Sequence, residues 1–87
     1  MKIVYSKSSL KFLKDLDKKS AERIRRAIEG LTHIPPKGDI KPMQGYESGA
    51  SRLRVGSWRI IFRIDDGDEI KILYIIKIGN RGDIYKQ

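Results

Sequence analysis

A run of alternating cationic and apolar residues from Arg52 to Arg63 constrains the fold of this chain more than any other segment. Two stretches with a period of two flank Gly56-Ser57, and glycine at the first central position suits a type II′ turn. Successive side chains of a strand point to opposite faces, so the run predicts a β-hairpin with one cationic and one apolar face. The predicted apolar face comprises Leu53, Val55, Trp58, Ile60, Phe62 and Ile64.

A third predicted strand, over residues 69–78, continues the alternation. Its pattern assigns Ile70, Ile72, Tyr74, Ile76 and Ile78 to the apolar face, and Leu73 and Ile75 to the cationic face, together with Ile61 of the hairpin. The cationic face then carries Arg52, Arg54, Arg59, Arg63, Lys71 and Lys77, and the alternation places no carboxylate beside them. Such a surface attracts polyanions, although Arg and Lys also commonly fill the solvated face of a sheet.

The composition agrees with an anionic partner. The chain has 87 residues, which we interpret as one domain over residues 1–87, and a net charge of +8. This charge favours a nucleic acid, an anionic membrane surface or an acidic protein as partner. We expect a cytoplasmic protein without a membrane segment, because no apolar run approaches about 20 residues and the apolar N-terminal stretch is too short for a signal sequence. The absence of cysteine is typical of a reducing compartment.

The remaining pattern predicts an α+β fold in the order β-α-α-β-β-β, with a helical hairpin packed on the apolar face of a small, mainly antiparallel sheet. Ser6 is the expected N-cap of a first helix that ends near Leu16, and Asp17 that of a second helix, which Gly30 ends. Prolines and glycines then predict a loop of about twenty residues. The acidic segment 65–68 predicts the next turn.

A stripe of lysines marks the exposed side of the first predicted helix. Its members are Lys7, Lys11, Lys14 and Lys18, and the apolar side carries Leu10, Phe12, Leu13 and Leu16. No metal site is expected, because the chain has one histidine, His33, and its clustered acids coincide with a turn. Glycine loops for nucleotides and nucleophile elbows are also missing from the sequence. Any catalysis therefore has to use Arg, Lys, Tyr and hydroxyl groups.

Three segments together resemble the RelE/ParE superfamily of bacterial and archaeal type II toxins. They are Lys41-Pro42-Met43 with Gly45, the run from Arg52 to Phe62, and the tail from Gly79 to Tyr85. The resemblance covers nearly the whole chain and implies the RelE-like fold. It leaves two activities open, since RelE-like members cut mRNA in the ribosomal decoding site and ParE-like members inhibit DNA gyrase without cleavage.

We favour the RelE-like branch, that of mRNA interferases, because Arg59, Arg81 and Tyr85 stand where these enzymes carry their catalytic Arg, Arg and Tyr. The predicted helical hairpin is also shorter than the ParE-like form usually has. The resemblance implies a reaction without metal or cofactor, in which the RNA 2′-hydroxyl attacks the adjacent phosphorus. Arg59 and Arg81 would stabilise the phosphorane, and Tyr85 would accept a proton or stack on a base. Asn80 departs from the His or Lys of many relatives.

The remaining cations are expected to bind rather than to react. Arg52 and Arg54 replace a basic pair, often Lys, that contacts the substrate; the predicted RNA contacts are Arg52, Arg54, Arg63, Lys71 and Lys77. The lysine stripe is expected to dock on the ribosome. The resemblance further implies an acidic antitoxin in a hetero-oligomer. We expect the antitoxin to lay a helix or strand over the cationic face and over Leu73 and Ile75.

Overall fold

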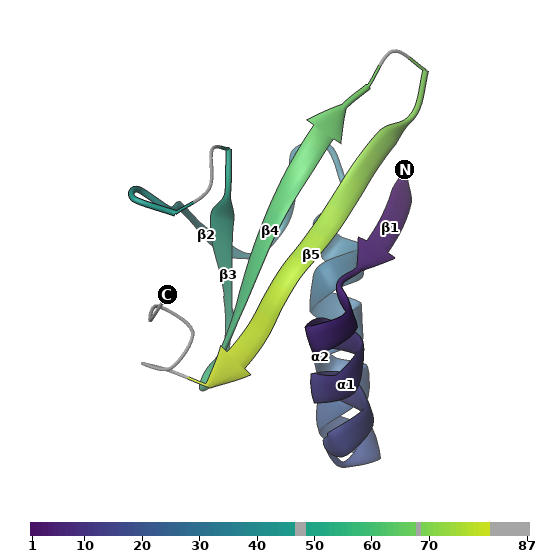
Figure 1. The fold of residues 1–87 in the computed structure, drawn as a ribbon, viewed down its shortest axis with the longest axis vertical. Helices are drawn as coiled ribbons and strands as arrows, with labels where there is room; N and C mark the ends of the chain where they lie inside the picture. Colours follow the sequence, from purple (N-terminus) through teal and green to yellow (C-terminus); the bar gives the residue numbers. More distant parts are fainter. Residues whose placement is uncertain (47–48, 68, 81–87) are drawn as a thin grey trace.

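The computed structural model describes residues 1–46, 49–67 and 69–80, which form one five-stranded sheet and two helices (Figure 1). In chain order the elements are β1 (Lys2–Tyr5), α1 (Lys7–Asp15), α2 (Lys18–Gly30), β2 (Asp39–Pro42), β3 (Ser51–Val55), β4 (Trp58–Asp66) and β5 (Lys71–Asn80). The order across the sheet is β1-β5-β4-β3-β2. The pair β1/β5 is parallel and the other pairs are antiparallel. The predicted α+β class is confirmed.

Both predicted helix caps are present. The Ser6 hydroxyl accepts a hydrogen bond from the Ser9 amide, and an Asp17 carboxylate oxygen accepts one from the Ser20 amide at 3.0 Å. Hydrogen bonds from Ser20 lower the pKa of Asp17. These caps satisfy amides that the first turn of a helix leaves unpaired. Neither helix in the described part of the chain has the length and apolar character needed to cross a membrane.

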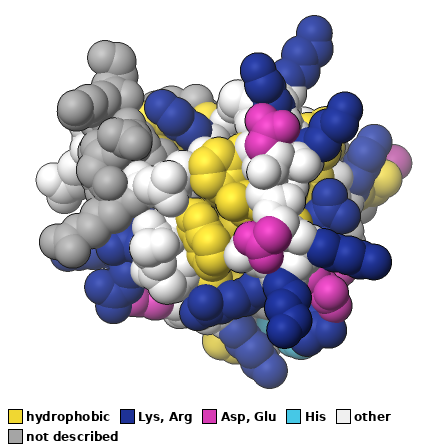
Figure 2. All heavy atoms as spheres, turned by 90° about the horizontal axis from the view of Figure 1, so that it is seen from below, with side chains coloured by type: hydrophobic (Ala, Val, Ile, Leu, Met, Phe, Trp, Pro, Cys, Tyr) yellow, Lys and Arg dark blue, Asp and Glu magenta, His cyan; other side chains and the backbone are white. Residues whose placement is uncertain are grey.

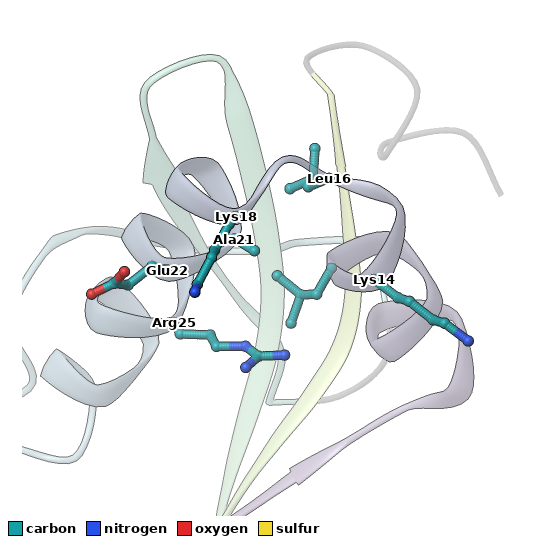
Figure 3. Close-up of a pocket in the computed structure, with 7 residues that line it drawn as sticks. Lys14, Leu16, Lys18, Ala21, Glu22 and Arg25 are labelled. Atoms are coloured by element: carbon teal, nitrogen blue, oxygen red, sulfur yellow. The ribbon is translucent and has the colours of Figure 1, made fainter.

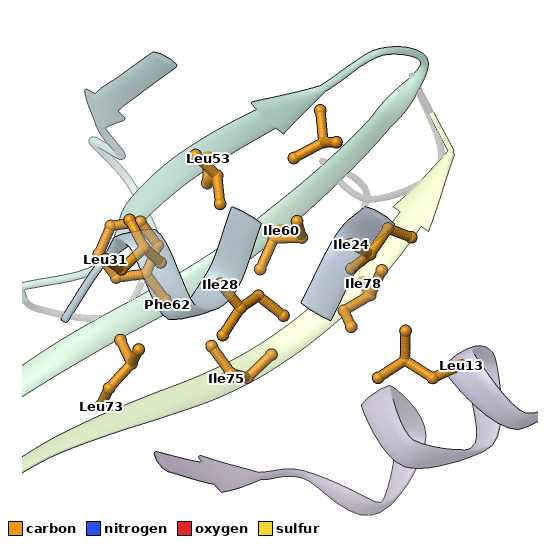
Figure 4. Close-up of a cluster of buried hydrophobic side chains, with 11 residues drawn as sticks. Leu13, Ile24, Ile28, Leu31, Leu53, Ile60, Phe62, Leu73, Ile75 and Ile78 are labelled. Carbon is orange, nitrogen blue, oxygen red and sulfur yellow. The ribbon is translucent and has the colours of Figure 1, made fainter. Parts of the chain in front are cut away.

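The core lies between the two helices and one face of the sheet (Figure 4). Ile24 and Ile28 of α2 are fully buried, as is Leu31, the C-cap residue that follows this helix, and α1 adds Leu13. The predicted burial of Leu10 is wrong, because this side chain is 50% exposed on the outer side of α1. The helices therefore cover a single face, and in the described part of the chain no helix covers the other. We call that second face the open face.

A short strand lies where a long loop was expected. β2 occupies Asp39–Pro42 and pairs with β3 at the edge of the sheet, with Asp39 opposite Arg54 and Lys41 opposite Arg52. Pro42 ends this strand, a position in which an edge strand tolerates the missing amide. The predicted order of elements therefore lacked one strand.

The predicted alternation of β5 is wrong over its first half. Leu73 and Ile75 are buried in the helix-facing core, and Tyr74 is opposite Arg63 on the open face. Ile70, expected in the core, is 60% exposed. A β-bulge explains why the prediction is wrong for one half of β5 and right for the other. Phe62 pairs with Ile75 but Ile61 pairs with Lys77, so β5 has one extra residue that reverses its alternation between the two faces.

Beyond the bulge the prediction holds, with Ile78 in the helix-facing core and Lys77 opposite Ile61. The extra residue, Ile76, packs on the open face. The other residues that the alternation had assigned to the core, Ile72 and Tyr74, precede the bulge and lie on the open face as well.

Candidate functional site

The β3–β4 hairpin places four arginines on the open face. Its turn is made by Gly56, which has a φ of +58°, and by Ser57, whose φ is not positive, as a type II′ turn requires. Arg54 lies directly opposite Arg59, and Arg52 and Arg63 follow at alternate positions of the same strands. The predicted placement of Arg52, Arg54, Arg59 and Arg63 on one face is confirmed, and their roles stay predictions.

The guanidinium of Arg59 bends back onto the hairpin turn. Its Nη1 donates hydrogen bonds to the carbonyl oxygens of Gly56 at 3.1 Å and Trp58 at 3.0 Å, and the residue is 8% exposed. Two bonds to the turn fix the direction of the side chain. On the helix side, the Arg23 guanidinium lies 5.8 Å from the centre of the Trp58 ring and joins α2 to the same turn.

An acid lies among the arginines, contrary to the prediction. One oxygen of the Asp39 carboxylate is 2.6 Å from Nη2 of Arg54, and the other is 3.4 Å from Nη2 of Arg52. The three side chains differ in exposure: 13% for Arg52, 45% for Asp39 and 52% for Arg54. The prediction missed Asp39 because it missed β2. The polar–apolar–polar sequence Asp39-Ile40-Lys41 was the available signal.

Apolar side chains and a stacked arginine occupy the rest of the open face. The guanidinium of Arg63 lies 4.9 Å from the centre of the Tyr74 ring, a cation–π distance. The loop between β2 and β3 covers Ile61 fully, in a small cluster of Met43, Tyr46, Ala50, Ile61 and Ile76. The apolar groups among the cations are thus those of this cluster, and the predicted Leu73 and Ile75 are inaccessible beneath the helices.

The two lysines of β5 lie in different parts of the sheet. Lys77 is half-buried beside α1, where it lines a groove of about 280 Å³ with Ser8, Lys11, Phe12, Asp15 and Ile78. Lys71 precedes the bulge, so it lies on the same side of the strand as Leu73, and its ammonium is 3.6 Å from Asp66 near the far end of the sheet. The prediction that Lys71 joins the cationic face is therefore wrong.

Two of the predicted catalytic residues, Arg81 and Tyr85, lie outside the described residues. β5 leads the chain to the hairpin turn, since Gly79 pairs with Arg59 and Asn80 with Trp58. Arg81 follows Asn80 directly in the sequence. Among the described residues, no group of three or more His, Asp or Glu side chains is placed to hold a metal ion.

The lysine stripe is divided between the two helices. Lys7, Lys11 and Lys14 lie on α1, and Lys18 is the first residue of α2, so the prediction of one continuous helical stripe is wrong. Lys14 and Lys18 instead project from the sides of a cavity of about 490 Å³ near the turn between the helices (Figure 3). Seen from below, this face of the molecule has a hydrophobic patch near its middle, and Lys and Arg side chains lie along much of its edge (Figure 2).

Comparison with known proteins gives a consistent result. The model of the family described as "ParE toxin of type II toxin-antitoxin system, parDE" matches residues 3–85. A chain of the archaeal RelE-RelB complex from Pyrococcus horikoshii OT3 superposes with a TM-score of 0.74 at 23% identity, covering 94% of this chain and 96% of that one. The YoeB/ParE toxin from Agrobacterium tumefaciens gives 0.73 at 23% identity, covering 92% and 98%.

A third structure is slightly closer in sequence. A chain of the RelB-RelE antitoxin-toxin complex from Methanococcus jannaschii has a TM-score of 0.65 at 27% identity, and covers 94% of each chain. No curated protein matches the sequence. The two structures at 23% identity establish the fold alone. The match to the family model over residues 3–85 is the evidence for the family of this chain.

Proposed function

This chain belongs to the family of ParE toxins of type II toxin–antitoxin systems, and within the wider RelE/ParE superfamily we propose that it follows the RelE-like branch, as a ribosome-dependent endoribonuclease that cuts translated mRNA in the cytoplasm. The observation that carries the proposal is the group of four arginines on the open face of the β3–β4 hairpin, from which the two helices are excluded. Arginine stays charged and binds phosphate with two parallel donors, so this face suits an RNA backbone.

The proposed reaction needs neither metal nor cofactor. The 2′-oxygen of one nucleotide attacks the adjacent phosphorus, a new P–O2′ bond forms, and the P–O5′ bond breaks. A base removes the proton of the 2′-hydroxyl, and the departing 5′-oxygen receives a proton. The products are a 2′,3′-cyclic phosphate and a 5′-hydroxyl. The protein has to align the attack and stabilise the negative charge of the phosphorane oxygens.

We assign the charge stabilisation to Arg59 and Arg81, and the proton transfer or base stacking to Tyr85. Arg59 suits this role because two hydrogen bonds to the turn carbonyls fix its guanidinium in advance. A donor that is already oriented loses little free energy in reorganisation during the reaction. Arg52, Arg54, Arg63 and Lys77 would hold the RNA strand. Lys71, which lies away from them, is withdrawn from this group.

We also propose an acidic antitoxin as partner in a hetero-oligomer. The structural relatives from Pyrococcus horikoshii and Methanococcus jannaschii are RelE-RelB complexes. An acidic segment over the arginines would neutralise their charge and block RNA in one step. Its apolar contacts would be made with the cluster of Met43, Tyr46 and Ile76, since Leu73 and Ile75 lie beneath the helices.

Inhibition of DNA gyrase is the second candidate function, because the description of the matched family names the ParE toxin. Mapping the 5′ ends of transcripts after induction of the isolated reading frame separates the two. We expect new 5′-hydroxyl ends within translated codons, and purified protein that leaves gyrase supercoiling unchanged. Intact messages with a DNA-damage response would instead support the gyrase inhibitor.

We expect the exposed lysines of α1 to take part in ribosome docking. Replacing Lys7 and Lys14 by glutamate is expected to weaken ribosome association several-fold. The slope of log K against log salt should become flatter by about one to two units, because two phosphate contacts are lost. Cosedimentation with ribosomes over a salt series measures both quantities.

The matched control replaces Lys2 and Lys37, which are also exposed, by glutamate. It changes the net charge equally but lies outside the α1 stripe. Equal weakening in the two variants would show that overall charge, rather than the stripe, governs association, and unchanged sedimentation of the α1 variant would exclude the stripe from docking.

A further inference from the structure

We propose that Asp39 occupies the position of an RNA phosphate between Arg52 and Arg54, and that it acts as a built-in competitor which sets the affinity of the open face for RNA. The carboxylate divides its two oxygens between two arginines, at 2.6 Å from Arg54 and 3.4 Å from Arg52. A phosphate group offers the same donors two non-bridging oxygens. Carboxylate and phosphate are interchangeable ligands for the guanidinium fork.

The sheet register places the acid between the two arginines. Asp39 begins β2 and lies directly opposite Arg54, and Arg52 is its diagonal neighbour two residues earlier on β3. Side chains at opposite and diagonal positions of one face come within reach of each other. The arrangement is therefore a property of the β2–β3 pairing, and it persists as long as this edge of the sheet is formed.

Exposure makes the acid displaceable. Asp39 is 45% exposed and Arg54 is 52% exposed, so water and salt screen this ion pair and it contributes little to stability. An RNA strand that contacts several arginines at once can take its place. The displaced carboxylate stays on β2, close to the incoming phosphate, and repels it. Asp39 should therefore weaken the binding of any polyanion that depends on Arg52 and Arg54.

The consequence concerns selectivity and rests on the proposed function. With the acid in place, the open face binds free RNA weakly. An RNA strand that the ribosome presents in the correct position would displace the carboxylate more readily. The ribosome has already ordered this strand, so the strand loses less entropy when it binds the toxin. Asp39 would thereby restrict the toxin to RNA on the ribosome.

The test compares Asp39→Asn with Asp66→Asn. The first change removes the charge but keeps the shape of the side chain. The second gives the same change of net charge at another acid in an exposed ion pair, 3.6 Å from Lys71 and away from the arginines. Binding is measured with a single-stranded, 2′-O-methylated RNA oligonucleotide, which the proposed reaction cannot cut, over a series of salt concentrations.

We expect Asp39→Asn to bind this RNA about five- to tenfold more tightly at low salt, with a slope of log K against log salt that is steeper by about 0.7 to 1.4 units. Asp66→Asn should change affinity less than twofold. In an Arg52→Gln/Arg54→Gln background the effect of Asp39→Asn should largely disappear, because the acid then lacks both of its arginine partners. Asp39→Ser provides the same comparison if the Asn variant does not fold.

Equal binding by the Asp39 and Asp66 variants would overturn the inference, as would an Asp39→Asn effect that persists when both Arg52 and Arg54 are replaced. These outcomes are independent of catalysis. Intact messages after induction would refute the proposed nuclease while the binding comparison still reports on Asp39. Normal cleavage with equal binding would refute only the role of Asp39.

Discussion

Arg59→Ala is expected to lower the single-turnover rate of mRNA cleavage on the ribosome by about a hundredfold or more. One lost electrostatic contact to the phosphorane corresponds to about 3 kcal/mol of transition-state stabilisation. RNA affinity should fall much less, since Arg52, Arg54 and Arg63 remain on the same face. Rapid mixing of the toxin with programmed ribosomes, at toxin concentrations in excess of the ribosomes, measures the rate and the affinity separately.

The control has to separate chemistry from folding, because Arg59 also bonds to the carbonyls of Gly56 and Trp58. Arg63→Ala is the matched variant: it removes a cation from the same strand and face, but one that stacks on Tyr74. It should reduce affinity more than rate. If Arg59→Ala keeps a cooperative melting transition and cleaves at close to the normal rate, the role of Arg59 is confined to the turn.

The features that the sequence predicts correctly are those decided by near neighbours. Ser6 and Asp17 cap their helices through amides three residues away, and Gly56 makes a turn that needs its positive φ. The hairpin around Gly56 then determines the face of every residue in β3 and β4, because an unbroken alternation carries the phase along both strands. The arginines of the open face were predictable for this reason.

Features that depend on distant partners were missed. β2 has four residues, ends in proline, and exists because β3 offers it an edge. In a segment rich in proline and glycine, the alternation of Asp39-Ile40-Lys41 is too short to identify such a partner. Because β2 was not predicted, Asp39 and its ion pairs with Arg52 and Arg54 in the candidate site were missed as well.

The prediction of which β5 residues face the helices was wrong for a different reason. The residues from Ile70 to Ile78 are apolar except for Lys71 and Lys77, so alternation alone does not determine which set faces the helices. The bulge at Ile76 adds a second difficulty, because the phase before it differs from the phase after it. Burial by α1 and α2 selects Leu73 and Ile75, and this selection depends on tertiary packing that no local pattern contains.

The phase of β5 leads to the second large expected effect. Leu73→Ala should lower the free energy of unfolding by about 2–5 kcal/mol, because the side chain is fully buried and its removal leaves a cavity. Ile70→Ala should change it by no more than about 0.5 kcal/mol, since Ile70 is 60% exposed. Urea denaturation followed by circular dichroism measures both changes.

Comparing Leu73→Ala with Ile70→Ala distinguishes the two possible orientations of the β5 side chains, because these orientations predict opposite results. If Ile70 faced the helices, its truncation would be costly and that of Leu73 would be mild. A domain of this size has a total stability of roughly 4–13 kcal/mol, so a loss at the upper end of the range for Leu73→Ala would leave much of the protein unfolded. In that event Leu73→Val, which removes less volume, still reports the direction. A greater loss in Ile70→Ala than in either Leu73 variant would contradict the observed phase, and it would return Leu73 and Ile75 to the open face as candidate contacts for the antitoxin.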